Sequence, residues 1–242
     1  MTTWMPWKIA KKDFKVLKRK KSITLYLVGL PLSLSLVFSL LVQSYVANAD
    51  VAGASLGLAS LTFVFVILAA VLPTSIAAYS IVGEKVEKSL EPLLATPPTD
   101  GELLLGKTVA AFLPAILATW GGSMVFMAST DYFTHSLLSS YYFPGWIPGI
   151  MLFVLAPLAA MLGVEVAVIL SSRVSDVRGA NQLGALVWIP FMAIFIAGVR
   201  GAIVFDAATL LAIAGTVLVL DLALLFLSRA TFNRETILTK WK

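Results

Sequence analysis

GEKVEKSLEPLLATPPTDGELLLGK, residues 83–107, is the long polar interruption around which an otherwise apolar sequence is arranged. Two stretches without a charged residue flank it, Val51–Gly83 before and Thr108–Thr130 after. Each is long enough to cross a bilayer as a helix, which takes about 20 apolar residues. The sequence therefore predicts two membrane spans joined by a charged connection.

The composition of the chain places it in a membrane. Of its 242 residues, 59% are hydrophobic and 13% are charged, and the mean hydropathy is +0.93. A soluble domain of this size could not bury so much apolar surface, so an all-α integral membrane protein is predicted. The chain has no cysteine and a single histidine. Disulfides and thiolate metal sites are thereby excluded, and neither a metal nor a cofactor is expected in this chain.

Hydropathy predicts a single domain of residues 1–242, with an interfacial helix in 1–22, a six-span bundle in 23–228 and a basic tail in 229–242. The spans are expected at about 23–46, within 51–83, within 108–128, and at about 147–170, 180–199 and 207–228. Residues 47–49 (ANA) resemble a signal-peptidase site. The apolar run before them is about twice the usual length of a signal-peptide core, so we interpret the first span as a retained anchor.

Two amphipathic segments are expected at the membrane surface. Near the N-terminus, Trp7, Ala10, Phe14 and Leu17 share one face at helical spacing, and lysines occupy the other faces. This pattern predicts a helix that lies on an anionic leaflet. Residues 131–146 are rich in aromatic side chains and are expected to form an outer connection at the level of the headgroups.

The basic residues lie on one side of this layout. Of the 18 Lys and Arg, all but Arg200 fall in residues 1–22, 83–107, 171–179 and 229–242. Lys and Arg concentrate in the cytoplasmic segments of membrane proteins. Both termini and the connection 83–107 are therefore predicted to be cytoplasmic, in a multi-pass protein of the cell membrane. Membrane orientation accounts for the basic charge, and no nucleic-acid partner is expected.

The connection has the chemistry of a short surface helix over residues 89–95. Ser89 suits the N-cap, and Glu91 falls in the first turn, where the helix dipole favours an anion. Such a helix either docks on a soluble partner or lies on the bilayer, and residue spacing does not separate these alternatives. The docking interpretation assigns the partner contact to Glu84, Lys85, Glu87, Lys88, Ser89, Leu90, Glu91, Leu93 and Leu94.

The order of residues in this connection resembles the cytoplasmic loop of type-2 ABC transporter permeases. The likeness rests on the charged run Glu84–Glu91, on residues 93–97 (LLATP) and on residues 103–107 (LLLGK), which lead into the third span. Many of these permeases have a re-entrant outer hairpin between the fifth and sixth spans, for which only residues 200–206 are available here.

The resemblance implies a permease subunit of an ATP-binding-cassette exporter, which moves a substrate out of the cytoplasm. Such a subunit pairs with a second copy or with a paralogous permease. A separate cytoplasmic ATPase binds ATP and Mg²⁺, so this chain is not expected to be an enzyme. The helix 89–95 and its flanks would form the coupling element that docks on that ATPase. A related alternative is the membrane subunit of an assembly machine that shares this coupling but moves a cofactor or a lipid.

Residues 101–108, GELLLGKT, match the phosphate-loop pattern G-x-x-x-x-G-K-[ST]. A true phosphate loop follows a buried strand and opens a soluble helix, so that free backbone N–H groups wrap the phosphates. Here residues 97–100 (PPTD) precede the octet and a membrane span follows it. We therefore interpret the octet as the start of that span, with Lys107 at the membrane boundary.

Two acids, Glu165 and Asp221, fall inside predicted spans. Each lies eight residues from a cytoplasmic arginine, Arg173 or Arg229, and hence about 12 Å deep. A central acid opposes insertion by about 2.5–3.5 kcal/mol, so both should face the bundle interior or water. They are either structural or part of a transport path. The second interpretation keeps open an ATP-independent channel or a carrier coupled to protons or sodium.

The topology is testable with single cysteines in this cysteine-free chain. Ser140→Cys should react with a membrane-impermeant thiol reagent in intact cells, because residues 131–146 are expected outside. Ser89→Cys should react only after the membrane is opened. Labelling of Ser89→Cys in intact cells would contradict the predicted orientation.

Overall fold

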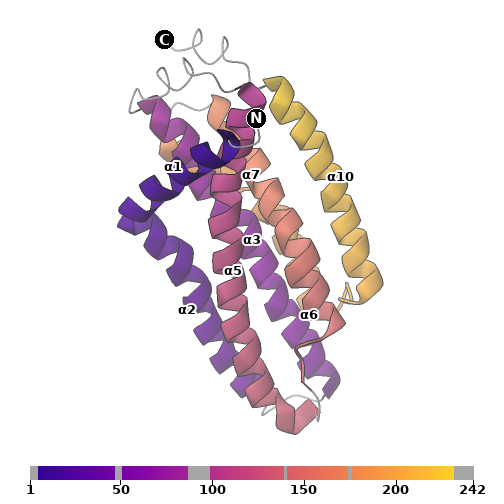
Figure 1. The fold of residues 1–242 in the computed structure, drawn as a ribbon. Coiled ribbons are helices and arrows are strands. Elements are labelled where there is room, and N and C mark those ends of the chain that lie inside the picture. The colour runs from indigo at the N-terminus through magenta and orange to yellow at the C-terminus, as the bar shows by residue number, and fades with distance from the viewer. Residues whose placement is uncertain (1–4, 47–50, 87–98, 139–140, 174–175, 232–242) are drawn as a thin grey trace.

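The computed structural model describes residues 5–46, 51–86, 99–138, 141–173 and 176–231 (Figure 1). Among these residues the regular elements are helical and none is a strand. Six helical segments are long and apolar enough to cross a membrane. They are Lys21–Gln43, Gly53–Ser80, Gly101–His135, Trp146–Ser171, Arg178–Val199 and Ala207–Ser228. The prediction of an all-α protein with six spans is thus confirmed at the level of helix number, length and composition.

The spans are arranged around a central helix, α3 (Val51–Val86). Helix α3 packs against α5 (Asp100–Leu138), α7 (Ala156–Arg173), α8 (Val177–Ala185) and α9 (Trp188–Val199). Helix α2 (Lys21–Val46) lies against α5, and α10 (Ala207–Thr231) lies against α7 on the other side (Figure 1). The outer helices expose large apolar side chains such as Leu40 and Phe226. Lipid tails are as apolar as leucine, so this exposure is normal in a bilayer.

Small residues let the central helices approach one another closely. A Cβ atom on Gly163 of α7 would collide with the carbonyl oxygen of Ala70 on α3. Ala156, Ala159 and Ala160 are fully buried on α7. Membrane helices associate largely through such close packing, because lipid gives them little hydrophobic drive to associate. This seam explains why α3 and α7 form the centre of the bundle.

The fourth span contains a π-helical turn that a tryptophan side chain completes. This span runs through α6 (Trp146–Ile150), η1 (Met151–Leu155) and α7. The N–H of Ala156 donates to the carbonyl of Met151, five residues back. In a regular α-helix it would donate to the carbonyl of Leu152, which therefore lacks this hydrogen bond. The next residue, Pro157, has no N–H to replace it. The indole N–H of Trp120 on α5 donates to the Leu152 oxygen instead, at 2.8 Å.

The fifth span consists of two helices, whereas the sequence predicted one continuous helix over about 180–199. Helices α8 and α9 are separated by a tight turn at Leu186 and Val187. The N–H groups of these two residues bond to the carbonyls of Leu183 and Gly184, three residues earlier. This short-range pattern redirects the chain without leaving those donors unpaired.

Both ends of the third span extend beyond their predicted limits. Helix α3 continues to Val86 and α5 begins at Asp100, so the connection expected over 83–107 is helical at both ends. The backbone N–H and side chain of Thr99 bond to the Glu102 carboxylate, and the Glu102 N–H bonds back to Thr99 Oγ1. This reciprocal pair is a capping box, which fixes the start of α5.

At the other end, α5 reaches Leu138, so residues 131–138 are helical where an outer connection was expected. The Asp131 carboxylate accepts a hydrogen bond from the Phe143 N–H at 3.0 Å, and Thr62 bonds to the Tyr142 hydroxyl at 3.0 Å. Burial of that phenol raises the pKa of Tyr142. Tyr132 and Trp146 are exposed. Their placement in an aromatic belt stays a prediction.

Two adjacent glycines of α5 give a matched test of helix packing. A Cβ atom on Gly122 would lie 2.5 Å from Pro31 Cβ on α2, whereas nothing lies within 4 Å of one on Gly121. We expect Gly122→Ala to lower the thermal unfolding midpoint in detergent, because α2 and α5 must separate; overpacking of this kind costs about 1–3 kcal/mol. Gly121→Ala is the control and should be neutral or slightly stabilising. Equal midpoints for the two variants would contradict this packing.

Candidate functional site

The end of the bundle where α3 stops and α5 begins is covered by the N-terminal helix α1 (Met5–Arg19), and we call it the α1 end (Figure 1). Helix α1 buries Ile9, Ala10 and Leu17. It crosses α5 so closely that a Cβ atom on Gly106 would lie 2.8 Å from Ile9 Cβ. Helix α3 ends at Val86 and α5 begins at Asp100 at this end of the bundle.

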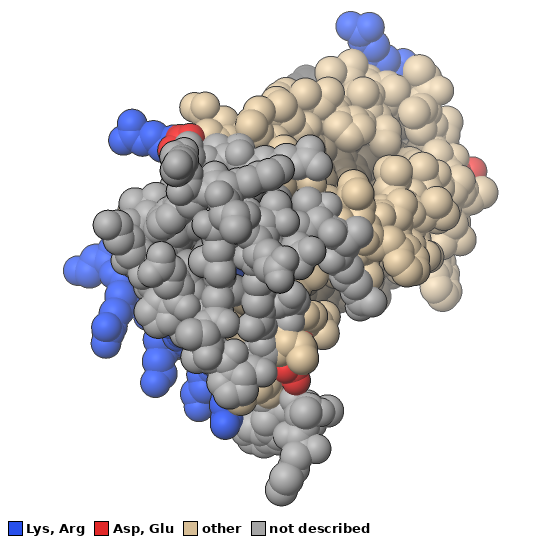
Figure 2. Space-filling view, turned by 90° about the horizontal axis from the view of Figure 1, so that it is seen from above, with Lys and Arg blue, Asp and Glu red and all other residues tan. Residues whose placement is uncertain are grey.

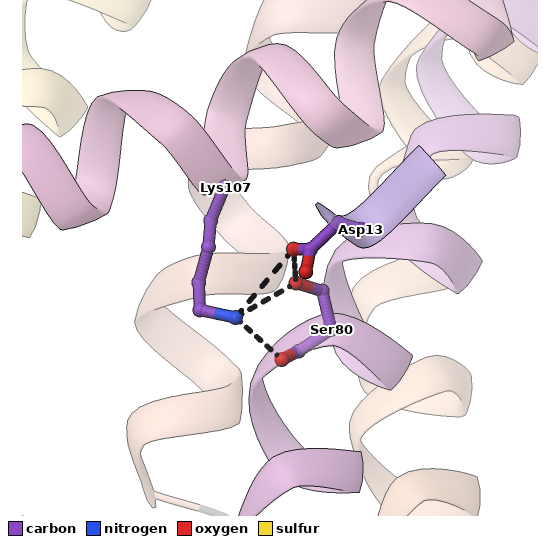
Figure 3. A network of polar contacts seen from close by, with 3 residues as sticks. All are labelled: Asp13, Ser80 and Lys107. Carbon is purple, nitrogen blue, oxygen red and sulfur yellow. Dashed lines mark hydrogen bonds and ion pairs between the residues drawn. The ribbon is translucent and has the colours of Figure 1, made fainter. Parts of the chain in front are cut away.

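A buried lysine joins three helices at the α1 end (Figure 3). The ammonium of Lys107 on α5 donates to the Ser80 carbonyl oxygen at 2.8 Å and to Ser80 Oγ at 3.0 Å on α3. It also lies 3.6 Å from Asp13 Oδ2 on α1, and the Ser80 hydroxyl donates to the same Asp13 oxygen at 2.7 Å. Lys107 is 2% exposed. We refer to these three residues as the Lys107 cluster.

The place of Lys107 at the membrane boundary stays a prediction, but its side chain is buried and does not extend into solvent. The ammonium instead points into the bundle, toward α1 and α3 (Figure 3). A buried charge is tolerated only when it is paired and hydrogen-bonded. Removing one partner from such a pair typically destabilises a protein by about 3–5 kcal/mol. The cluster therefore fixes the positions of α1, α3 and α5 relative to one another.

The octet 101–108 is helical throughout, as part of α5. The N–H of Leu103 bonds to the carbonyl of Thr99, as in an ordinary helix. A phosphate loop needs these donors free and turned toward the ligand. The geometry agrees with our interpretation of the octet as the start of a span.

The outer face of α1 is strongly basic. Lys8, Lys11, Lys12, Lys15 and Arg19 surround a shallow groove on this helix. Blue side chains project along one side of the α1 end (Figure 2). The predicted apolar face is only partly buried, since Ala10 and Leu17 are packed inward while Trp7 remains 48% exposed and contacts Phe14 edge to face. Attachment of α1 to a leaflet stays a prediction.

The coupling residues predicted from the sequence fall at the edge of the described structure or beyond it. Glu84 and Lys85 lie in the last turn of α3. Those outside the described residues are Glu87, Lys88, Ser89, Leu90, Glu91, Leu93 and Leu94. The structure shows where this segment leaves the bundle and where it returns, at Val86 and Thr99.

The two intramembrane acids face the bundle interior, as predicted. Glu165 on α7 is 4% exposed and Asp221 on α10 is 5% exposed. The two carboxyl groups are close enough for their charges to interact. None of their four oxygens has a hydrogen-bond partner among the described residues. The sequence indicated their burial, but it could not show that the two residues lie together.

Sequence reasoning missed Asp13 and Ser80 as partners of Lys107. Asp13 carries a signal, because it is the one acid among the basic residues of segment 1–22. An acid among so many basic residues is expected to pair with one of the cations of the chain. Ser80 carries no such signal, since serines are common in membrane helices and its contact depends on the crossing of α1 over α3 and α5.

The comparisons with known proteins do not assign this chain to a family. No protein-family model matches the sequence, and no curated protein matches it either. Function must therefore be argued from the residues and from the arrangement of the helices.

The Lys107 cluster can be tested by a double-mutant cycle. Asp13→Asn leaves the buried ammonium without its counter-charge and should lower the free energy of unfolding by about 3 kcal/mol. Lys107→Met keeps the side-chain volume but leaves the Asp13 carboxylate without its cation, and it should also destabilise the protein. The double variant should be more stable than the sum of the two losses predicts.

Denaturation of the detergent-purified variants measures these free energies. Arg200→Met serves as the control, because Arg200 is exposed and such surface changes usually stay within about 0.5 kcal/mol. Strict additivity of the two single losses would show that the Lys107–Asp13 contact does not hold α1 on the bundle.

Proposed function

We propose that this chain is the membrane-spanning permease subunit of an ATP-binding-cassette exporter. In this proposal it pairs with a second copy or a paralogous permease, and a separate cytoplasmic ATPase binds ATP and Mg²⁺. The observation that carries the proposal is the Lys107 cluster, which lies where the connection 87–98 leaves and rejoins the bundle. A force applied to that connection would act on three joined helices.

The position of α3 gives such a force a route into the bundle. Helix α3 leads into the connection and also packs against α5, α7, α8 and α9. A displacement of its end would therefore be passed to most of the spans through close contacts such as Gly163 on Ala70. Pro73 within α3 removes one backbone hydrogen bond, which provides a place where this helix can bend.

The predicted orientation of the bundle in the membrane supports the same proposal. The start of α1, the ends of α3 and α10 and the start of α5 lie together at the α1 end (Figure 1). The Lys and Arg counted above concentrate in the segments at this end. With the α1 end in the cytoplasm, as the positive-inside rule requires, the connection would face a soluble ATPase.

The coupling residues provide the decisive test. We expect Leu93→Asp to weaken docking of the ATPase about a hundredfold, because burial of one leucine contributes roughly 1.5–3 kcal/mol and each 1.4 kcal/mol is a factor of ten. The measurement is retention of the cytoplasmic ATPase in a pull-down, together with substrate-stimulated hydrolysis. Ala95→Asp is the matched control, because it adds the same charge at a residue that is not among the predicted contact residues.

Neutralising Glu84, Glu87 or Glu91 should have smaller effects that depend on salt, because these charges would lie at the rim of the contact. All these variants should still insert, since the changes lie outside the spans. Normal docking and stimulation in Leu90→Asp/Leu93→Asp would mean that the connection is only a surface segment, and would contradict the proposal.

A second candidate function is an ATP-independent channel or a carrier coupled to protons or sodium. The observation that favours it is the pair of buried carboxyl groups Glu165 and Asp221, which have no hydrogen-bond partner in the described part of the chain. The two candidates differ in one measurable property. The carrier moves its substrate in liposomes that contain this chain alone and an ion gradient, whereas the permease requires the ATPase.

A further inference from the structure

The two intramembrane acids lie on the facing surfaces of α7 and α10. The buried positions of α10 follow one stripe, Leu210, Ala214, Val217 and Asp221, while Leu220 and Leu222 on either side of the acid are exposed. Asp221 is thus turned inward, toward α7, where Glu165 is also buried and near enough for the two charges to interact. The pair is built into the contact between two spans.

No charged group of the described structure neutralises this pair. The described charged side chains on the helices packed against α7 and α10 are Glu102, Lys107 and Asp131 of α5 and Arg178 of α8. Lys107 is engaged with Ser80 and Asp13, Glu102 with Thr99, and Asp131 with Phe143, and Arg178 is exposed. The side chains of Glu84, Lys85, Asp100, Arg173 and Arg229 lie outside the described set.

Glu165 also lines a small cavity that lies toward the α1 end. Gly101, Leu104, Leu105 and Thr108 form its wall on α5, and Leu225 and Ser228 close it from α10. The cavity measures about 70 Å³. It can hold a few water molecules, each of which needs at least about 10–15 Å³ by this measure. It is far below the roughly 300–1,000 Å³ of a site for a drug-sized molecule.

Two adjacent carboxylates in such surroundings need positive charge. Bare charges buried among apolar side chains are opposed by several kcal/mol each, so protons or a bound cation must occupy the pair. Carboxylate, hydroxyl and water oxygens are the ligands that small hard cations prefer. Glu165, Thr108 and Ser228 line the cavity, so residues with carboxyl and hydroxyl groups lie in its wall.

We propose that Glu165 and Asp221 form a binding site for one small inorganic cation, which displaces carboxyl protons to solvent and reaches the pair through this cavity. The site goes beyond the permease proposal and does not depend on it, since the cation would bind whether or not an ATPase docks. Because α7 and α10 each supply one carboxyl group, an occupied site holds these two helices together.

Thermal unfolding of the metal-free protein in detergent tests the site. Na⁺, K⁺, Mg²⁺ and Ca²⁺ are each titrated as chloride salts, with choline chloride keeping the ionic strength constant. One of them should raise the unfolding midpoint and then saturate, because a ligand that binds only the folded state stabilises it. The half-saturating concentration should rise as the pH falls, by up to about tenfold per pH unit for each proton displaced.

Glu165→Gln and Asp221→Asn should each abolish the saturable increase, or raise the half-saturating concentration by at least about tenfold. Asp206→Asn is the matched control, because Asp206 is exposed at the start of α10 and bonds to the Thr209 N–H. Hydrogen bonding by the Thr209 side chain, and then by its backbone N–H, holds the pKa of Asp206 below its usual value. This variant should shift the midpoint at most uniformly and keep the full response to the cation.

An unchanged response in both acid variants would overturn the proposal, since the cation would then bind elsewhere. Stability that depends on pH but on none of the four cations would overturn it as well, because protons alone would occupy the pair. If the acid variants do not fold, the wild-type protein decides the question. Adding the stabilising cation in weak buffer should release protons, and the absence of release contradicts the site.

Discussion

Every backbone carbonyl in the interior of a membrane bundle needs a donor, because lipid offers none. In this chain the constraint is visible at Leu152, whose carbonyl loses one donor to a π-helical turn and cannot gain another from Pro157. The indole of Trp120 supplies the missing hydrogen bond from a neighbouring helix. An unpaired buried acceptor costs about 1–3 kcal/mol. The irregular turn of the fourth span and its contact with α5 are therefore one feature, and neither is explained without the other.

The buried ionisable groups are handled in two different ways. Lys107 has its counter-charge and its hydrogen bonds within 4 Å, so it acts as a fixed joint between α1, α3 and α5. Among the described residues Glu165 and Asp221 have neither, although they are buried as deeply. A bundle that needed only stability would not be expected to hold two carboxyl groups together without a donor. Lys107 is thus a structural charge, whereas Glu165 and Asp221 form a pair that can exchange bound protons for a cation.

Much of the fold could be predicted from the sequence, because runs of apolar residues report the spans directly. The limits of α5 could not, since its first turn is polar and depends on the Thr99–Glu102 capping box rather than on hydropathy. The break between α8 and α9 was also missed, because Leu186 and Val187 are as apolar as their neighbours. At the candidate site, the burial of Glu165 and Asp221 followed from their depth. The Lys107 cluster and the meeting of the two acids depend on helix crossings, which no local pattern encodes.

The short turn between α9 and α10 holds one end of the sixth span, so a tilt of this span would have its pivot at that end. Phe205 in this turn packs onto Gly198 and stacks on Phe63 of α3, with 5.1 Å between the ring centroids. Helix α10 then runs about 33 Å from Ala207 to Ser228 at 1.5 Å per residue. A tilt of about 5° around the pivot would move Ser228 by roughly 3 Å and residues near Phe205 hardly at all. Any change in the spacing of α7 and α10 is thus amplified at the cavity beside Glu165, where a gap of a few ångströms decides whether a hydrated ion can pass.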